Sequence, residues 1–287
     1  MTLLQATREA AELVKFPHTV FALPFALISM LAAAHGVPSW RVVVLVLVAM
    51  VGARTAAMAF NRLVDQPIDA RNPRTAARAL PGGRLRRSFA WTMVAAGAVA
   101  LIGAAWLLNP LCLVLTPLVL GWLLAYSYSK RFTALSHLWL GASLGLAPVG
   151  AWLAVRGSLA APPLVLMAAV TAWVAGFDIL YSLQDEGFDR TWGLRSLPVR
   201  LGAARAIATA RLLHAGAALG FAAFAHLVSA GWGLWVGVAA AVALLVWQHS
   251  LVAPGRLEKL DTAFFTANGV LSVLMFVLYL LDMIGRA

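Results

Sequence analysis

The sequence has 287 residues, of which 62% are hydrophobic and only 11% are charged, and its mean hydropathy is +0.86. Soluble domains carry about 25% charged residues, so this composition excludes a soluble globular protein and indicates a polytopic membrane protein. The formal net charge of +11 does not by itself indicate nucleic-acid binding, because the basic residues are confined to particular loops.

Apolar stretches of roughly 18 residues or more, enough to span a bilayer, recur along the whole chain. We expect nine of them, at 17–36, 40–60, 89–108, 110–128, 138–155, 162–182, 204–228, 231–251 and 264–284. The first is long and lacks a convincing cleavage site, so we expect a membrane span and not a cleaved signal peptide. The predicted fold is all-α, a polytopic bundle of nine transmembrane helices that forms a single membrane domain over residues 1–287.

The basic residues fall mainly on one side of this predicted bundle. With the N-terminus in the cytoplasm, most of the 22 Lys and Arg lie in the N-terminal segment and in the 61–88, 127–137, 183–211 and 252–263 regions. The opposite side holds only Arg41, Arg156 and Arg286. This positive-inside bias predicts a cytoplasmic N-terminus and an external C-terminus. It also explains the net charge without nucleic acid as a partner.

Cysteine and histidine give little sign of a site. Cys112 is the only cysteine and lies in an apolar stretch, which excludes an intrachain disulfide and a thiolate zinc centre. The six histidines are scattered singly, and His35, His214, His226 and His249 lie in or beside apolar segments. We expect such lone histidines to be packing or interfacial residues.

Acidic residues are rare, and their placement is the most informative feature of the chain. Only 11 Asp and Glu are present, and six of them fall in two short windows. The first follows the second apolar stretch and reads Asn61-Arg-Leu-Val-Asp65-Gln-Pro-Ile-Asp69; the second follows the sixth and reads Asp178-Ile-Leu-Tyr181-Ser-Leu-Gln-Asp185-Glu-Gly-Phe-Asp189. Acids at or near membrane depth are costly and are usually functional.

The spacing within each window predicts a shared helical face, because residues four apart lie on one side of a helix. Asn61, Asp65 and Asp69 form such a stripe, although Pro67 is expected to kink the helix or to place Asp69 in a loop. The second window predicts one face as well; its members are Asp178, Tyr181, Asp185 and Asp189.

Paired carboxylates at helix ends predict a site for divalent cations and, through them, for a diphosphate. The two Asp-x-x-x-Asp pairs lie 120 residues apart, and internal repeats would place them across the bundle from each other. The alternative is that these acids only neutralise neighbouring arginines, namely Arg62, Arg71 and Arg190. Two windows in a chain so poor in acids favour the functional interpretation.

Basic residues near these windows fit the same site. Arg and Lys suit phosphate oxygens, and the candidates are Arg74, Arg78, Lys130 and Arg131. The alternative is topology together with attraction to anionic lipid headgroups. We favour that alternative for Arg84, Arg86 and Arg87, which cluster at the entrance of a span.

The two windows, together with several shorter motifs, resemble the UbiA superfamily of intramembrane prenyltransferases. Its members have nine transmembrane helices, Asn-x-x-x-Asp-x-x-x-Asp after the second and Asp-x-x-x-Asp after the sixth. The resemblance covers most of the chain and includes Asn72-Pro-Arg74-Thr75, Tyr126-Ser-Tyr-Ser-Lys130-Arg131, Asp178-x-x-Tyr181 and Gly193-x-Arg195-Ser196. One departure is Arg62, where many members have Asp; the metal-facing positions are retained.

The resemblance implies a site and a mechanism. It implies Mg²⁺ ions on Asn61, Asp65, Asp185 and Asp189, with support from Asp69, that bind a polyprenyl diphosphate. It implies that Arg74, Arg78, Lys130 and Arg131 neutralise the leaving pyrophosphate as the allylic C–O bond ionises. Asp178 would then orient or deprotonate the phenol of a small aromatic acceptor, with assistance from Tyr181. An ordinary interface tyrosine is the equal alternative for Tyr181.

The motifs are most similar to the quinone-pathway branch of that superfamily. Its members prenylate 4-hydroxybenzoate or, in a menaquinone route, a dihydroxynaphthoate such as 1,4-dihydroxy-6-naphthoate. The resemblance therefore implies an integral protein of the bacterial cytoplasmic membrane, surrounded by lipid, with its active site facing the cytoplasm. Both Mg²⁺ and Mn²⁺ accept these ligands, and the oligomeric state is left open.

Other classes of membrane protein match the pattern less well. A secondary transporter would also have acids at membrane depth, but usually on helices broken by Gly or Pro at mid-bilayer. Here the acids cluster at one mouth, which suits an amphiphile with a wet head and an apolar tail. A phosphotransferase acting on nucleotide-activated alcohols would need an Asp-Gly-x-x-Ala-Arg signature, which the sequence lacks. A non-catalytic scaffold has no use for paired acids.

Overall fold

The computed structural model describes residues 9, 13, 21–255, 257–258, 260 and 262–286. The predicted N-terminal segment with Arg8 and Lys15, and the start of the first predicted span, lie outside the described residues. The chain divides into two compact units: unit 1 comprises Met1–Thr19 and Ser39–Tyr128, and unit 2 comprises Val20–Pro38 and Ser129–Ala287. The single domain over 1–287 stays a prediction.

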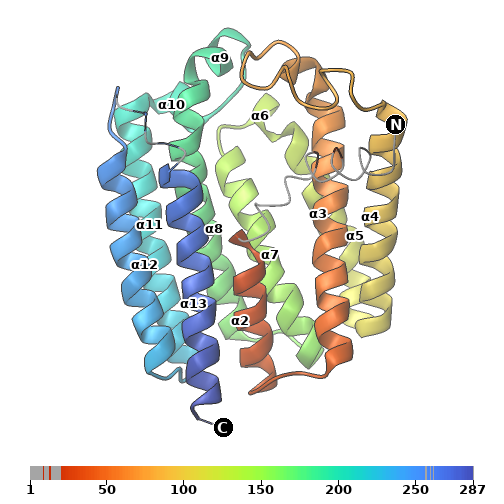
Figure 1. Cartoon of the computed structure of the whole chain (residues 1–287), viewed down its shortest axis with the longest axis vertical. Coiled ribbons are helices and arrows are strands. Elements are labelled where there is room, and N and C mark those ends of the chain that lie inside the picture. The colour runs from red at the N-terminus through yellow and green to blue at the C-terminus, as the bar shows by residue number, and fades with distance from the viewer. Residues whose placement is uncertain are drawn as a thin grey trace. The chain divides into compact units, whose positions relative to one another are not determined.

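Unit 1 is built from three long helices that follow one another along the chain (Figure 1). They are α3 (Trp40–Asp69), α4 (Arg87–Leu108) and α5 (Pro110–Ala125), and a short 3₁₀ turn, η2 (Tyr126–Tyr128), follows. Glycine allows α3 and α4 to approach closely, because a Cβ on Gly52 would lie 2.7 Å from the carbonyl oxygen of Gly97. The two backbones therefore touch where neither helix carries a side chain.

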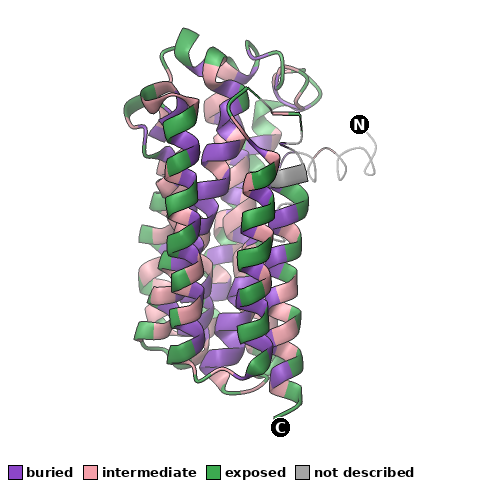
Figure 2. Cartoon of the chain, turned by 90° about the vertical axis from the view of Figure 1, so that its left-hand side faces the viewer, coloured by how far each residue is buried: buried purple, intermediate pink, exposed green. Residues whose placement is uncertain are grey.

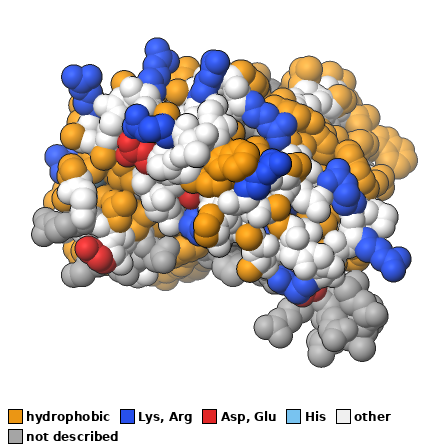
Figure 3. Space-filling view, turned by 90° about the horizontal axis from the view of Figure 1, so that it is seen from above, with side chains coloured by type: hydrophobic (Ala, Val, Ile, Leu, Met, Phe, Trp, Pro, Cys, Tyr) orange, Lys and Arg blue, Asp and Glu red, His pale blue; other side chains and the backbone are white. Residues whose placement is uncertain are grey.

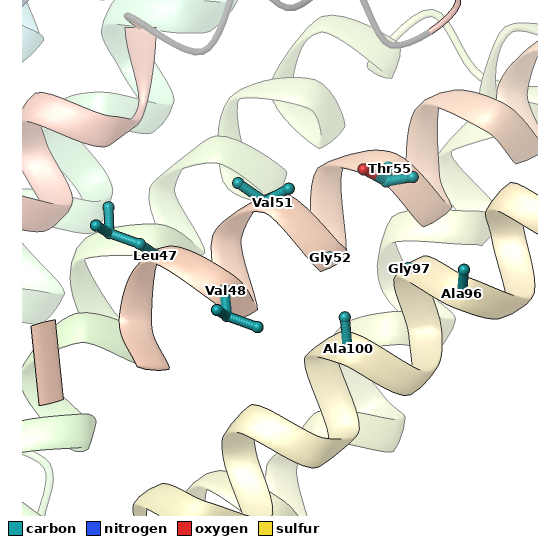
Figure 4. A pocket seen from close by; sticks show the side chains of 8 residues that line it. All are labelled: Leu47, Val48, Val51, Gly52, Thr55, Ala96, Gly97 and Ala100. Atoms are coloured by element: carbon teal, nitrogen blue, oxygen red, sulfur yellow. The ribbon is translucent and has the colours of Figure 1, made fainter. Parts of the chain in front are cut away.

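A shallow groove runs along the outside of this close approach (Figure 4). Its walls come from α3 and α4 and are almost entirely apolar, with Val48, Val51 and Thr55 on one side and Ala96 and Ala100 on the other. No acidic residue lines it. The groove is therefore part of the apolar helix surface and separate from the acidic windows.

Unit 2 contains the remaining elements. They are α2 (Leu23–Ala34), α6 (Ser129–Phe132), α7 (Ser136–Arg156), α8 (Ala161–Ser182), η3 (Leu183–Asp185), α9 (Glu186–Thr191), α10 (Leu197–Leu201), α11 (Ala203–Leu227), α12 (Trp232–Leu251), the π-helical turn η4 (Thr262–Thr266) and α13 (Ala267–Ile284). Helix α8 lies between α7 and α11 and packs along both. It is therefore the central helix of the unit, and it carries the start of the second acidic window.

The core of unit 2 is aromatic around α8. Trp173 is fully buried and packs edge-on against Phe25 and Phe177, while Phe25 stacks on Phe221. The indole Nε1 of Trp173 donates a 2.9 Å hydrogen bond to Oδ1 of Asn268 on α13. This bond satisfies the only polar atom of a side chain that otherwise contributes apolar surface, and it fixes α13 against α8.

Many large apolar side chains lie on the outward faces of the helices. Leu219 of α11 is 74% exposed, whereas Phe221, two residues later, is fully buried. In Figure 2 the helices nearest the viewer turn exposed residues outward and buried residues toward their neighbours. Large side chains in this position need lipid around them and not water. The structure is that of an integral membrane protein.

The predicted helical fold is confirmed, but not the count of nine spans. Eight helices in the described part of the chain are long and apolar enough to cross a membrane. The helix α2, where the first span was predicted, has only 12 residues, fewer than the roughly 20 that a bilayer requires. The count and the cytoplasmic N-terminus stay predictions.

Two local expectations about the acidic windows can be compared with the helices. Helix α3 continues through Pro67 and ends at Asp69, so the loop placement of Asp69 is not observed. The second window does not form one continuous α-helix, because α8 ends at Ser182 and a 3₁₀ turn leads into α9. Asp178 and Tyr181 therefore lie on α8, whereas Asp185 ends η3 and Asp189 lies on α9.

Candidate active site

The first acidic window lies at the end of α3 in unit 1. The side-chain amide of Asn61 donates a 2.8 Å hydrogen bond to Oδ2 of Asp65, one helical turn away. Both side chains are partly exposed. The predicted stripe is therefore present at its first two positions, with amide and carboxylate oxygens side by side.

Asp69, the third position of that stripe, is buried and bound by two arginines. Nη1 of Arg78 lies 2.8 Å from each carboxylate oxygen of Asp69, and Nη1 of Arg62 lies 3.6 Å from Oδ2. The hydroxyl of Thr75 donates to the backbone carbonyl of Asp69. Asp69 therefore attaches the 70–86 loop to the end of α3. At Asp69, therefore, the structure shows the alternative in which an acid of the window pairs with arginines, and its partners are Arg62 and Arg78.

The loop after α3 also carries exposed cations, Arg71 and Arg74. Arg74 is exposed, and its backbone N–H donates to Oδ1 of the buried Asn72 in a tight turn. Figure 3 shows a face of the molecule with many Lys and Arg side chains and few Asp and Glu. A surface of this sign attracts polyanions.

The second window lies in unit 2 and is more deeply buried. Asp185 is 8% exposed and Asp189 only 2% exposed. Oδ2 of Asp189 lies 3.6 Å from Nζ of Lys130 and has no hydrogen-bond donor among the residues that the structure describes. A buried carboxylate oxygen without a donor is costly. This arrangement fits a carboxylate that takes a cation as its further partner.

Arg195 holds the short helix α6, which carries Lys130, beside the second acidic window. The backbone N–H of Arg195 donates a 2.7 Å hydrogen bond to the carbonyl of Lys130, and its Nη1 donates another to the carbonyl of Phe132. Gly193, with φ +65°, supplies the left-handed turn that brings Arg195 back toward this loop. The structure thus joins the predicted Lys130 to the second window, and Arg131 beside it is exposed.

Asp178 and Tyr181 lie one turn apart on α8, as their spacing predicts. Oδ2 of Asp178 lies 2.6 Å from Nδ1 of His137 at the start of α7. The ring of Tyr181 packs on Phe264, with 4.1 Å between ring centroids. Asp178 is therefore held by a polar contact and Tyr181 by an aromatic one.

No metal centre is formed by the side chains alone. Within the described ranges, no three His, Cys, Asp or Glu residues lie close enough together to hold an ion. Each unit contributes one Asp-x-x-x-Asp pair, and the structure brings together Asn61 with Asp65, and Lys130 with Asp189. Oxygen donors and adjacent cations are the groups that a metal-bound diphosphate requires.

Comparison with known proteins identifies the family. Residues 22–276 match the model of the UbiA prenyltransferase family. The chain belongs to the UbiA prenyltransferase family. It is therefore an enzyme, a prenyltransferase, and the family match runs through both units and both acidic windows. The resemblance seen in the motifs is confirmed.

Relatives in this family have related names and the same fold. The chain is 31% identical to a 4-hydroxybenzoate octaprenyltransferase of Burkholderia multivorans over 85% of this chain and 84% of that protein. A UbiA homolog from Aeropyrum pernix K1, in its apo structure, is 35% identical with a TM-score of 0.85, covering 93% of this chain and 98% of that one. A UbiA homolog from Archaeoglobus fulgidus bound to GPP and Mg²⁺ is 19% identical, with a TM-score of 0.75 and coverage of 96% and 99%, and shares the fold.

Two residues that contact candidate site residues were not assigned a role from the sequence. His137 contacts Asp178 across 41 residues of chain and Leu197 across 60, and no spacing rule connects such distant positions. Arg195 was part of a recognised motif, but its two bonds to the Lys130 loop depend on the fold. The sequence gives one signal for His137: it directly precedes the fifth predicted span, and the next span contains Asp178 near its end.

Proposed function

We propose that this UbiA-family enzyme transfers a polyprenyl group from polyprenyl diphosphate to a small aromatic acceptor in ubiquinone or menaquinone biosynthesis. The acceptor is 4-hydroxybenzoate or 1,4-dihydroxy-6-naphthoate. The single observation that carries the proposal is the buried Asp189, whose Oδ2 lacks a hydrogen-bond donor in the described chain and faces Lys130 at 3.6 Å. The names of the relatives, 4-hydroxybenzoate octaprenyltransferase, support the aromatic acceptor.

The diphosphate end of the substrate belongs at the acidic windows. The proposed Mg²⁺ ligands are Asn61, Asp65, Asp69, Asp185 and Asp189, with Asp69 in a supporting place because two arginines already bind it. When bound, Mg²⁺ neutralises the diphosphate and stabilises charge on the leaving pyrophosphate. The GPP and Mg²⁺ bound to the homolog from Archaeoglobus fulgidus support a divalent cation.

Cations of the chain complete the binding of the diphosphate. Lys130 and Arg131 lie on the short helix α6 and Arg74 lies in the 70–86 loop, and all three are exposed or partly exposed, so they can contact phosphate oxygens. Arg78 keeps its proposed place as well, with its guanidinium oriented by Asp69. As the allylic C–O bond breaks, the electron pair leaves with pyrophosphate, and these side chains stabilise the added negative charge.

The acceptor end of the site belongs at Asp178. The acceptor ring attacks the allylic carbon that pyrophosphate has left, a C–C bond forms, and the ring carbon then gives its proton to the released pyrophosphate or to water. Asp178 is proposed to accept the hydrogen bond, or the proton, of the acceptor's phenol, with Tyr181 one turn away as its assistant. The carboxylate suits this role because its side chain is 19% exposed and is supported by a buried histidine.

Turnover of the purified protein tests this proposal. The protein in detergent is incubated with Mg²⁺, a long-chain polyprenyl diphosphate and either acceptor, and the products are identified by mass spectrometry, with EDTA as a control. We expect a prenylated adduct of one acceptor that disappears with EDTA. If neither acceptor reacts and the diphosphate does not bind, the transfer reaction is wrong and the transporter alternative returns.

Substitution of the windows tests the assigned residues. Asp65→Ala and Asp185→Ala should each abolish turnover without unfolding the protein, because each removes a proposed ligand of the metal-bound diphosphate. Glu186→Gln is the matched control, since Glu186 is in the same sequence window but pairs with the exposed Arg190. Near wild-type rates in either aspartate variant would refute the metal-site assignment.

We further propose that the protein lies in the bacterial cytoplasmic membrane with this site facing the cytoplasm. The basic loops that flank the windows support this orientation, because cytoplasmic loops of membrane proteins are rich in Lys and Arg. We propose that membrane lipid surrounds the apolar faces of its helices.

A further inference from the structure

His137 is a fully buried histidine that bridges two elements of unit 2. Its side chain is 0% exposed at the start of α7. Nδ1 lies 2.6 Å from Oδ2 of Asp178 on α8, and Nε2 accepts a hydrogen bond from the backbone N–H of Leu197 at 3.4 Å. Both ring nitrogens are therefore engaged, one by a carboxylate and one by a backbone donor.

The backbone contact fixes where the ring proton lies. A nitrogen that accepts a hydrogen bond from a backbone N–H carries a lone pair there, so the proton of the neutral ring is on Nδ1. That proton points at Asp178. The imidazole thus donates a hydrogen bond to Oδ2 of Asp178 and fixes the position of this carboxylate.

This contact leaves one oxygen of Asp178 for another partner. Oδ2 is taken by His137, whereas Oδ1 has no hydrogen-bond donor among the described residues, and the side chain is 19% exposed. The carboxylate is held at one oxygen and open at the other. A functional acid that is oriented by a third group in this way is the usual arrangement for a positioned base.

We propose that His137 is a positioning residue for Asp178, which directs Oδ1 toward the hydroxyl group of the aromatic acceptor. This inference rests on the proposed function, because it concerns the same acceptor. The competing explanation is that His137 only fills the space between α7 and α8. The two explanations differ in what a substitution that keeps the Nδ1 donor should do.

Three substitutions separate them. In His137→Asn the amide nitrogen takes the place of Nδ1 and can still donate to Asp178, whereas the amide of His137→Gln reaches the place of Nε2 instead. His137→Ala removes both contacts. With saturating polyprenyl diphosphate, kcat should fall about 10- to 100-fold in the Gln and Ala variants, the usual cost of losing a group that orients a functional side chain. The Asn variant should stay within about threefold of wild type, and the KM for polyprenyl diphosphate should not change in any of them.

A double substitution gives a second, independent readout. In an Asp178→Asn background, His137→Gln should cost no further activity, because the residue that it positions is already lost. Thermal melting in detergent shows which variants fold, and the Asn and Gln pair decides the test if the Ala variant does not.

The outcomes distinguish this inference from the proposed function. If wild type prenylates an acceptor but the Asn and Gln variants are equally impaired, or if their KM for polyprenyl diphosphate rises, His137 does not position Asp178. If wild type prenylates neither acceptor, the proposed function fails and this inference falls with it. Loss in Gln with retention in Asn supports both.

Discussion

At the scale of single residues, the carboxylate of Asp69 is both a predicted metal ligand and an ion-pair partner of two arginines. The sequence predicts it as the third member of a ligand stripe, and the structure buries it against Arg62 and Arg78. A carboxylate bonded through both oxygens to a guanidinium has less to offer a metal than the adjacent Asp65. Its contacts instead secure the loop that carries Arg74. A spacing of four residues indicates that side chains share one helical face, but it does not indicate which neighbouring side chains will bind them.

The ion pairs of Asp69 predict a large loss of stability on substitution. Asp69→Asn leaves two mostly buried guanidinium groups without a counter-charge, and breaking a buried pair costs about 3 kcal/mol or more. Glu186→Gln removes an exposed pair with Arg190, and such pairs contribute about 0.5 kcal/mol. Denaturant unfolding in detergent should therefore show a much larger loss for Asp69→Asn. Equal losses would mean that Asp69 is not a structural anchor.

His137 shows what residue spacing cannot predict. A lone histidine beside an apolar stretch is most often a packed side chain, and His214 fits that expectation: it is buried and hydrogen-bonded to His249 and to the carbonyl of Trp173. His137 is equally buried, but its partner is the acid of the site. The difference lies in which element packs opposite each histidine, which only the fold determines.

At the scale of elements, helices were predictable and their ends were not. Apolar runs located the long helices because a membrane span must satisfy its backbone within itself. Pro67 is expected to disturb α3, yet α3 continues to Asp69. Pro67 lies only two residues before that last residue, so its ring and its missing N–H act only on the last turns of the helix. The second window was predicted as one face, but α8 ends at Ser182 and the chain tightens into a 3₁₀ turn. No periodicity in the sequence marks that change.

The short helix α6, which carries Lys130, is held by Arg195, a residue distant in sequence. Arg195→Ala removes the bond from its guanidinium to the carbonyl of Phe132, although the backbone bond to Lys130 remains. We expect faster amide exchange in residues 129–135 and a higher KM for polyprenyl diphosphate, because one of the two bonds that hold Lys130 beside Asp189 is lost and the other alone holds it less firmly. Arg200→Ala is the control, since Arg200 is also exposed and basic but lies on α10.

Amide exchange tests this prediction independently of the enzyme's activity. If Arg195→Ala and Arg200→Ala exchange alike in residues 129–135, the guanidinium does not order the loop. If Arg200→Ala raises the KM equally, the effect comes from net positive charge at the mouth and not from the loop geometry.

At the scale of the whole molecule, composition predicted the class of fold and the side chains confirm it. With 62% hydrophobic residues, the chain has more apolar surface than two helical units can bury, and the remainder faces outward, as in Leu118 and Leu219. The number of spans was less predictable because hydropathy measures apolar length and not helix length. Helix α2 shows this, with 12 helical residues where an apolar stretch of 17–36 was predicted.

The orientation of the protein in its membrane is the last property that the sequence predicts and an experiment can decide. In a Cys112→Ala background, Ala77→Cys places a thiol in the exposed 70–86 loop, and Ser158→Cys places one in the exposed turn between α7 and α8. Because arginines crowd the first loop and only Arg156 adjoins the second, the positive-inside bias puts Ala77 in the cytoplasm. A membrane-impermeant maleimide should then label Ser158→Cys in intact spheroplasts and Ala77→Cys only after lysis. The reverse pattern would place the acidic windows outside the cell and require polyprenyl diphosphate to be supplied from there.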